Sequence, residues 1–178
     1  ILTKRRSLAD RLLAADRSVS EILWLQRDSD RHAGVRGMLR LAGELRQRHY
    51  RQCWILHGST RYALTAWLAG IPQRIGFGSG AQRWWLKRST NLPSSYQHQH
   101  PIDKANALLQ RAGVSLTESE PSLVLNPALV EQVRATYANC PQPWFALGIG
   151  SSEPNKQWGA DKFAELAKKL LARGASCM

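Results

Sequence analysis

Apolar and polar residues follow two different periods along this chain, and the changes between them predict strands followed by helices. Compact apolar runs of strand length occupy residues 20–26, 50–58, 72–78 and 143–150. Apolar residues recur at helical spacing around residues 8–13 and over residues 32–49, 61–70, 101–114, 126–140 and 160–173. Strands and helices that alternate at short spacing are typical of βαβ units. The sequence therefore predicts an α/β fold with a mainly parallel sheet covered by helices.

The proline-rich stretch at residues 140–144 has the composition of a linker and predicts two domains, residues 1–140 and 141–178. The second of these is a single strand–loop–helix, which cannot bury its own sheet face alone. The first begins with only a short stub of possible strand. We therefore expect the chain to be an internal piece of a longer protein, with its second α/β domain incomplete.

The balance of charge indicates an anionic partner. There are 25 Lys and Arg residues against 13 Asp and Glu, a formal net charge of +12, and residues 45–102 contain no Asp or Glu. Such a field favours nucleic acid, a phosphorylated substrate or an acidic membrane surface, and the alternative is a solvated basic face that only maintains solubility. No apolar run approaches the roughly 20 residues of a membrane span. The three cysteines, Cys53, Cys140 and Cys177, fit no metal or redox spacing, which predicts buried or idle thiols in a reducing cytosol.

A small-residue turn between the last predicted strand and helix has the chemistry of a phosphate-binding loop. Gly148 and Gly150 allow close approach of the backbone, Ser151 and Ser152 offer hydroxyl donors, and Lys156 adds a positive charge beside the helix N-terminus. The spacing is neither a Walker loop nor a dinucleotide fingerprint. An ordinary turn with one lysine remains an equal alternative on these residues alone.

Two segments resemble the ADP-heptose:lipopolysaccharide heptosyltransferases, glycosyltransferase family 9. "LGIGSSEPNKQWGADKFAELAKKL" is similar to the family's strand, small-residue turn, Lys-x-Trp and amphipathic helix, and "WILHGSTRYALTAWLAGIPQRIGF" is similar to a stretch of its N-terminal half. The resemblance implies a GT-B arrangement of two Rossmann-like domains. Residues 1–140 would form the acceptor-side domain without its first strand, and residues 141–178 would begin the domain that binds the nucleotide sugar.

The same resemblance implies transfer of heptose from ADP-heptose to the inner core of lipopolysaccharide on lipid A, with inversion. Ser151, Ser152 and Lys156 would contact the donor phosphates, and Lys156 would make a metal or other cofactor unnecessary. Arg61, His57 and Lys104 would face the acceptor. A purely structural hydrogen bond is as plausible for His57, and an ordinary surface position is the simpler interpretation of Lys104.

The expected acceptor is an anionic lipid, so the resemblance also implies a cytoplasmic protein, peripheral on the inner face of the inner membrane. The segment "AQRWWLKRS" combines Arg83, Lys87 and Arg88 with Trp84 and Trp85, and could lie against anionic headgroups. Alternatively, one of the two tryptophans packs inward and the segment is an ordinary covering loop. Trp158 follows the turn expected to bind phosphate, and we expect it to anchor the loop against the following helix rather than to stack on a sugar.

The catalytic base stays unassigned. The family's Gly-Asp turn, which carries the proposed general base, is expected before Ile1, and its Asp-Thr-Gly-x-x-His loop is expected after Met178. We therefore expect these 178 residues alone not to turn over substrate. Two other functions compete with the transferase. One is a basic α/β domain that binds nucleic acid, although the sequence has no nucleic-acid fold signature and its basic residues lie on βα connections rather than on one recognition helix. The other is a non-catalytic scaffold that kept the fold and lost the site.

Overall fold

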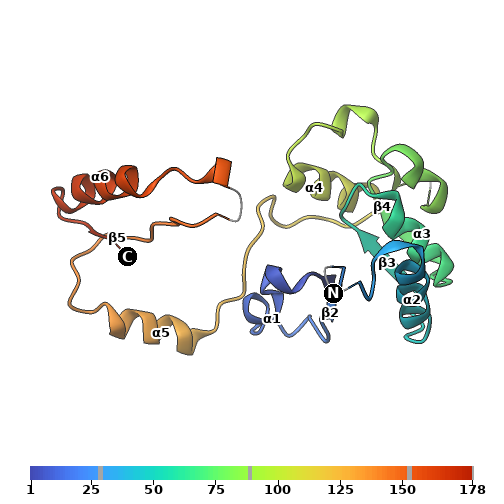
Figure 1. Cartoon of the computed structure of the whole chain (residues 1–178), viewed down its shortest axis with the longest axis horizontal. Helices are drawn as coiled ribbons and strands as arrows, with labels where there is room; N and C mark the ends of the chain where they lie inside the picture. The colour runs from blue at the N-terminus through green and yellow to red at the C-terminus, as the bar shows by residue number, and fades with distance from the viewer. Residues whose placement is uncertain (28–29, 88–89, 152–153, 178) are drawn as a thin grey trace. The chain divides into compact units, whose positions relative to one another are not determined.

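The computed structural model describes residues 1–27, 30–87, 90–151 and 154–177. The chain divides into two compact units, Ile1–Val124 and Leu125–Met178 (Figure 1). Helix α5 (Pro127–Thr136) belongs to the second unit by its contacts, although the linker-like segment follows it in the sequence. The domain boundary near residue 140 stays a prediction.

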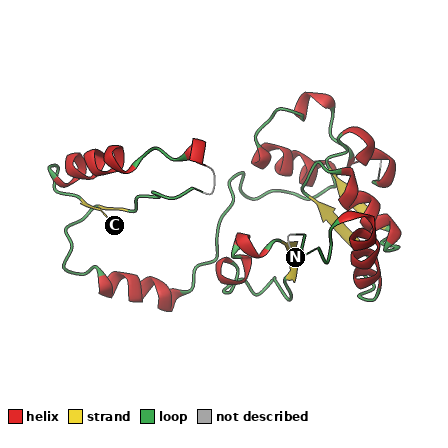
Figure 2. Ribbon diagram, in the orientation of Figure 1, coloured by secondary structure: helices red, strands yellow, loops and turns green. Residues whose placement is uncertain are grey.

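The first unit contains the alternating elements that the hydrophobic pattern predicts, each somewhat shorter than expected (Figure 2). Its strands are β1 (Leu2–Thr3), β2 (Leu23–Trp24), β3 (Gln52–Ile55) and β4 (Gln73–Gly76). Its helices are α1 (Ala9–Leu12), α2 (Gly34–Arg46), α3 (Thr60–Leu68) and α4 (Pro101–Arg111). Short 3₁₀ helices η1 (Arg5–Ser7), η2 (Gly80–Trp85) and η4 (Ser94–Tyr96) occupy the connections.

All strand pairs of the described residues are parallel, as predicted, but they form separate two-stranded sheets rather than one. β1 pairs with β2, and β3 pairs with β4 in a register that sets Gln52 opposite Gln73 and Ile55 opposite Gly76. β1 and β2 are only two residues long, so their ladders are too short to extend the sheet toward β3. Each pair encloses a helix in its connection and forms a βαβ unit.

Helices cover the β3–β4 pair on both faces, which makes this unit Rossmann-like. The larger core cluster joins α2, α3 and the strands, with the buried residues Leu41, Ala42, Leu45, Ile55, Ala63, Ala66, Ala69, Ile71 and Leu86. On the other side, Ile75 and Phe77 pack with Leu108 of α4. Gly76 lies between these alternating residues, where a Cβ atom would come 3.0 Å from Leu86 Cδ1 and 3.2 Å from the Ile55 carbonyl oxygen. A side chain at position 76 would therefore require the Leu86 side chain and the neighbouring strand β3 to shift slightly.

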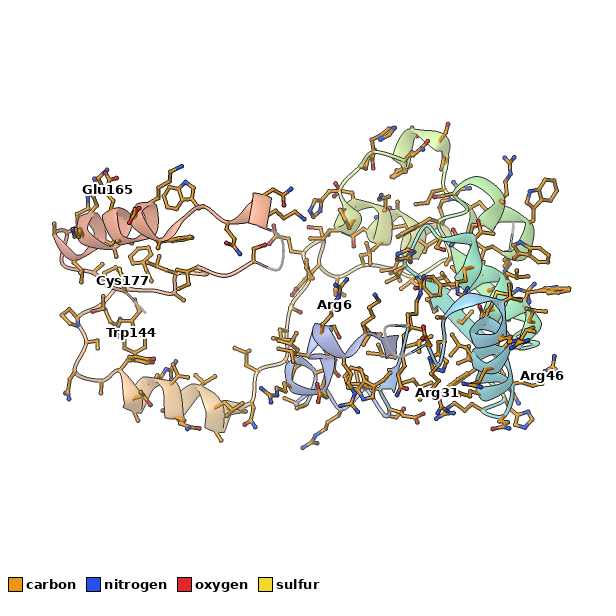
Figure 3. All side chains as sticks on the ribbon, viewed as in Figure 1. Arg6, Arg31, Arg46, Trp144, Glu165 and Cys177 are labelled. Carbon is orange, nitrogen blue, oxygen red and sulfur yellow. The ribbon has the colours of Figure 1, made fainter. Side chains whose placement is uncertain are left out.

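The second unit holds one further βαβ connection. β5 (Trp144–Phe145) pairs in parallel with β6 (Ser176–Cys177), and between them lie η5 (Pro154–Lys156) and α6 (Ala160–Leu171). Figure 3 labels Trp144 and Cys177 on these strands, and the Trp144 indole donates to the Cys140 carbonyl at 3.1 Å. The strand predicted at 143–150 is shorter than expected, and β6 had no counterpart in the sequence pattern. Ala175 is the single buried apolar residue of this unit in its described part, so it buries little of its own sheet face, as predicted.

Candidate functional site

The loop from β5 to α6 holds the residues predicted to bind phosphate. The Gln157 side-chain amide donates to the Ser151 carbonyl oxygen at 3.0 Å, which closes the loop on itself. Ser151 is half-buried, and Lys156 is exposed at the end of η5. Ser152, the third predicted phosphate ligand, lies outside the described residues.

The start of α6 is held next to this loop by an aromatic contact and a glycine. The rings of Trp158 and Phe163 meet edge to face with centroids 5.1 Å apart, which confirms the predicted anchoring role of Trp158. Gly159 precedes the helix with φ +100°, a conformation that strongly favours glycine, and it offers no capping side chain. No side chain caps the first N–H groups of α6, which leaves them available as anion donors, although the Asp161 carboxylate in the first turn partly opposes an anion.

Gly148 and Gly150 leave open space along the loop. A Cβ atom at either position would meet no described atom within 4 Å, and neither residue has a positive φ. Neither glycine is therefore required by the described packing or by the backbone conformation. The open space fits the close backbone approach that the sequence predicts for a phosphate group.

His57 follows β3 at the carboxyl edge of the β3–β4 pair and is exposed. Its Nδ1 accepts a hydrogen bond from the Ser59 backbone N–H at 3.0 Å, and its ring meets Tyr62 edge to face at 5.1 Å. In a neutral ring this bond leaves the proton on Nε2, because Nδ1 serves as the acceptor. His57 thus makes the structural hydrogen bond considered for it and also carries an Nε2–H donor.

Arg61 and Lys104, the other predicted acceptor ligands, also contact the protein. Nη2 of Arg61 donates to the carbonyl oxygens of His32 at 2.8 Å and Gly34 at 2.6 Å, which ties α3 to the start of α2. The Lys104 ammonium group lies 5.8 Å from the centroid of the Phe77 ring, and it donates to the carbonyl oxygen of Gln97, just after η4, at 3.4 Å. Phe77 directly follows β4, so Lys104, on α4, contacts the same sheet edge that His57 follows. Acceptor binding by these residues stays a prediction.

Gln82 organises this edge, and no periodicity in the sequence marks it. Its side chain is fully buried. Its Oε1 accepts from the Gly78 N–H at 3.0 Å, and its Nε2 donates to the His57 carbonyl at 2.7 Å. Since Ile55 and Gly76 are in register, these bonds join the loops two residues beyond the ends of β3 and β4. Nothing in the local sequence singles out Gln82, which stands between Ala81 and Arg83 in an irregular segment.

Four cations of the acid-free stretch, residues 45–102, have hydrogen-bond or ion-pair partners among the described residues. Arg46 donates to the Leu68 carbonyl at 2.6 Å at the end of α3, and Arg48 pairs with Glu21 at 2.9 Å. Arg74 donates to the Trp85 carbonyl at 2.6 Å and also to that of Ile71, and Arg61 bonds as described above. These four guanidinium groups keep their charge, but the fold fixes their positions.

The two adjacent tryptophans of η2 have different environments. Trp85 packs against the main core and its ring lies 4.9 Å from that of Trp67, whereas Trp84 is 65% exposed. One tryptophan therefore packs inward, as in the second of the two interpretations of this segment. Arg88 of the same segment lies outside the described residues.

The three cysteines are free thiols. Burial raises the pKa of Cys53 to about 11, which keeps this thiol protonated and fits a structural role. Within residues 1–27, 30–87, 90–151 and 154–177, no helix has the length and apolar character needed to cross a membrane, and no three His, Cys, Asp or Glu side chains gather as a metal site would require.

Comparison with known proteins decides the family. The model of glycosyltransferase family 9 (heptosyltransferase) matches residues 38–178. The chain belongs to this family. It is 26% identical over 151 residues to lipopolysaccharide heptosyltransferase 2 of Salmonella typhimurium and, equally, to that of Escherichia coli K12. These matches cover 76% of this chain and 41% of each relative, so the family 9 chain spans less than half the length of its curated relatives.

Solved structures confirm the predicted fold. The E. coli ADP-heptose lipopolysaccharide heptosyltransferase II matches 99% of this family 9 chain and 53% of its own, with a TM-score of 0.65 and 18% identity. The family 9 glycosyl transferase of Veillonella parvula DSM 2008 matches 99% of this chain and 52% of its own, with a TM-score of 0.68 and 17% identity. The α/β, GT-B type fold with Rossmann-like units is therefore established.

Proposed function

We propose that this protein is a glycosyltransferase that moves heptose from ADP-heptose to the inner core of lipopolysaccharide, with inversion. The observation that carries the proposal is family 9 membership over residues 38–178. The β5–α6 loop supports it, because open glycines, a lysine and the first amides of a helix lie together there. The Rossmann-like first unit supplies the acceptor-side loops.

In this proposal the β5–α6 loop binds the diphosphate of the donor. Ser151 and Ser152 donate hydrogen bonds to phosphate oxygens, and the first amides of α6 add to them. Negative charge grows on the leaving ADP oxygen as the glycosidic bond breaks. The ammonium group of Lys156, held at the end of η5, stabilises that charge without a metal ion.

The acceptor is proposed to bind at the carboxyl edge of β3 and β4. The Nε2–H of His57 and the cations of Arg61 and Lys104 would face its phosphates and carboxylates. Since such an acceptor is embedded in a bilayer, the protein would act as a peripheral protein on the cytoplasmic face of the inner membrane. Its partners would then be ADP-heptose, the lipid acceptor and the anionic inner leaflet.

The experiment compares Lys156→Ala with Lys168→Ala in the complete protein. Both changes remove one exposed lysine charge, but Lys168 lies in the last turn of α6, away from the loop. Loss of a charge-assisted contact predicts a ten- to hundredfold weaker ADP affinity for Lys156→Ala, about 1.5–3 kcal/mol, with little change for Lys168→Ala. Heptose transfer is measured in parallel with ADP-heptose and a purified acceptor.

Three results would count against the proposal. Unchanged ADP affinity and turnover in Lys156→Ala would remove the phosphate-binding role of this loop. Absence of transfer by the wild-type protein would contradict the reaction itself and favour the scaffold. Tight binding of generic DNA, with a steep dependence of log affinity on log salt, would favour the nucleic-acid alternative.

A further inference from the structure

A buried histidine closes the loop that follows β2. The side chain of His32 is only 3% exposed, and the residue lies just before α2. Its Nδ1 accepts a hydrogen bond from the Gln26 backbone N–H at 3.0 Å, and its own backbone N–H donates to the Gln26 carbonyl oxygen at 2.9 Å. The Leu25 N–H, one residue earlier, donates to the Thr3 carbonyl oxygen of the neighbouring strand at 2.7 Å. The two bonds between Gln26 and His32 therefore fix the loop at the carboxyl end of β2.

The other ring nitrogen of His32 meets a carboxylate of α2. Because Nδ1 is an acceptor, a neutral ring carries its proton on Nε2, which lies 3.2 Å from Glu44 Oε2. Arg31, labelled in Figure 3, donates to Oε1 of the same carboxylate at 2.6 Å. Glu44 therefore holds two consecutive residues of the loop against the helix.

A glycine allows the His32 backbone to lie directly on α2. A Cβ atom at Gly37 would come 2.4 Å from the His32 carbonyl carbon and 2.7 Å from its Cα atom. These are backbone atoms, so no rotation of a side chain relieves the clash. Gly37 and Glu44 are about two helical turns apart and share one face of α2. At Gly43, on the same helix, a Cβ atom would meet no described atom within 4 Å.

The backbone held in this way anchors Arg61 at the start of α3. The carbonyl oxygens of His32 and Gly34 accept from Arg61 Nη2 at 2.8 and 2.6 Å. Gly34 has φ +55°, a left-handed conformation that favours glycine. Arg61 is half-buried, and its Nε and Nη1 hydrogens have no partner among the described residues. No described carboxylate pairs with this guanidinium group, so within the described chain only carbonyl dipoles balance its charge.

We propose that His32 is a positioning residue for Arg61. Its buried ring fixes the two carbonyl groups that hold Nη2, which leaves Nε and Nη1 to donate to an anionic group, phosphate or carboxylate, of the acceptor. This inference rests on the proposed function, in which Arg61 faces the acceptor. A guanidinium group anchored through one nitrogen is already ordered before the anion arrives, so binding costs less side-chain entropy.

The test is steady-state heptose transfer by the complete protein, with acceptor and ADP-heptose varied separately. Gly37→Ala displaces the His32 backbone from α2, and Gly43→Ala on the same helix is the matched control. Gly37→Ala is expected to raise the KM for the acceptor about tenfold, because displacing a binding group by about 1 Å can cost up to about 100-fold. The KM for ADP-heptose should stay within about twofold of wild type, and Gly43→Ala should change neither constant.

His32→Leu is a second variant, which tests the ring itself. Leucine has a similar volume, so the change removes both ring hydrogen bonds and keeps most of the packing. It should raise the KM for the acceptor as Gly37→Ala does, whereas His98→Leu, at an exposed position outside this network, should not. Circular dichroism checks that each variant is folded at the assay temperature. A merely structural role would lower kcat through partial unfolding and would leave both KM values unchanged.

A double-mutant cycle decides whether His32 acts through Arg61. Arg61→Ala alone should raise the KM for the acceptor about ten- to hundredfold, as expected for the loss of a charge-assisted hydrogen bond. Adding His32→Leu to Arg61→Ala should raise it less than about twofold further, because the group that His32 positions is already gone. Losses that multiply would overturn the inference. An unchanged KM for the acceptor in both Gly37→Ala and His32→Leu would overturn it as well.

The inference and the proposed function fail separately. Absence of transfer by the wild-type protein would contradict the reaction, whereas wild-type transfer with unaltered variants would contradict only the role of His32. Nitrogen-15 NMR of the Arg61 side chain needs neither substrate. The Nη2 hydrogens should exchange slowly with solvent in wild type and faster in Gly37→Ala and His32→Leu. Equal exchange in all three proteins would overturn the positioning role, whatever the transfer assay shows.

Discussion

Replacing Gln82 by Met tests whether one buried amide holds the carboxyl edge of β3 and β4 together. Methionine has a similar length and volume and fills the same space, so the change removes hydrogen bonds and leaves the packing largely intact. It leaves the Gly78 N–H and the His57 carbonyl without their side-chain partner. The weaker contact to the Ser59 carbonyl, at 3.4 Å, is lost as well.

The expected cost follows from how little the loop can relax. Gly78 has φ +74°, and a Cβ atom there would lie 2.6 Å from the Asn91 side chain, so the loop is packed closely around this amide. Each orphaned group costs about 1–3 kcal/mol, so we expect the free energy of unfolding to fall by about 2–4 kcal/mol. With an m-value near 1–2 kcal/mol per molar urea, the unfolding midpoint should fall by about 1–4 M.

Urea unfolding and amide hydrogen exchange measure this effect together. The Gly78 amide should exchange faster in Gln82→Met, because its acceptor is gone. Gln110→Met, at an exposed position on α4, is the control and should stay within about 0.5 kcal/mol of wild type. A Gln82→Met protein as stable as that control, with an unchanged Gly78 exchange rate, would refute the role of Gln82 in joining the loops after β3 and β4.

Two further predictions concern ionisable groups. Partial burial opposes ionisation of Glu44, yet the hydrogen bond from Arg31 and the charges of Arg31 and His32 outweigh it and hold its pKa below 4.5. A lowered pKa means that the stabilisation by Glu44 is present above pH 4.5 and disappears as pH falls through the lower, folded-state pKa. Urea unfolding should therefore show a difference in stability between wild type and Glu44→Gln that is constant near neutral pH and vanishes below pH 4.5. A difference that stays the same down to pH 2 would contradict this. Cys53, with its pKa raised to about 11 by burial, should react with an aromatic disulfide at pH 8 far more slowly in the folded protein than in urea, measured in the Cys140→Ser, Cys177→Ser background; equal rates would show that the thiol is accessible.

The candidate donor loop could be located from the sequence because its signals are local. Glycines, hydroxyl groups and a lysine between an apolar run and an amphipathic helix are neighbours in the chain, and the helix begins at Ala160 as predicted. The anchoring contact of Trp158 spans only five residues, to Phe163. Strand lengths were harder to predict, since β5 ends at Phe145 where the apolar pattern continues to residue 150. A strand extends only as far as it hydrogen-bonds to a partner strand, and the partner of β5, β6, lies some thirty residues away in the sequence.

The first unit shows the opposite case. In the sequence, the cations of residues 45–102 stand out only because no Asp or Glu lies among them, and nothing distinguishes one cation from another. In the structure, Arg61 spans 27 residues to reach Gly34, Arg46 spans 22 to Leu68, and Gln82 spans 25 to His57. These side chains donate to backbone carbonyl oxygens at helix ends and in loops, and the sequence around each donor does not indicate which carbonyl it will reach.

The sequence by itself determined the alternation of strands and helices up to α6, the parallel α/β class, the family and the place of the loop proposed to bind phosphate. Hydrophobic periodicity and turn chemistry act over a few residues, so they can be recognised in the sequence. Only the tertiary structure decided which arginines serve the fold, which tryptophan of the pair faces outward, and that a buried glutamine joins two strand ends. Those outcomes depend on hydrogen bonds and burial between segments that meet only when the βαβ units pack, because a buried polar group takes whatever partner the packed neighbours present.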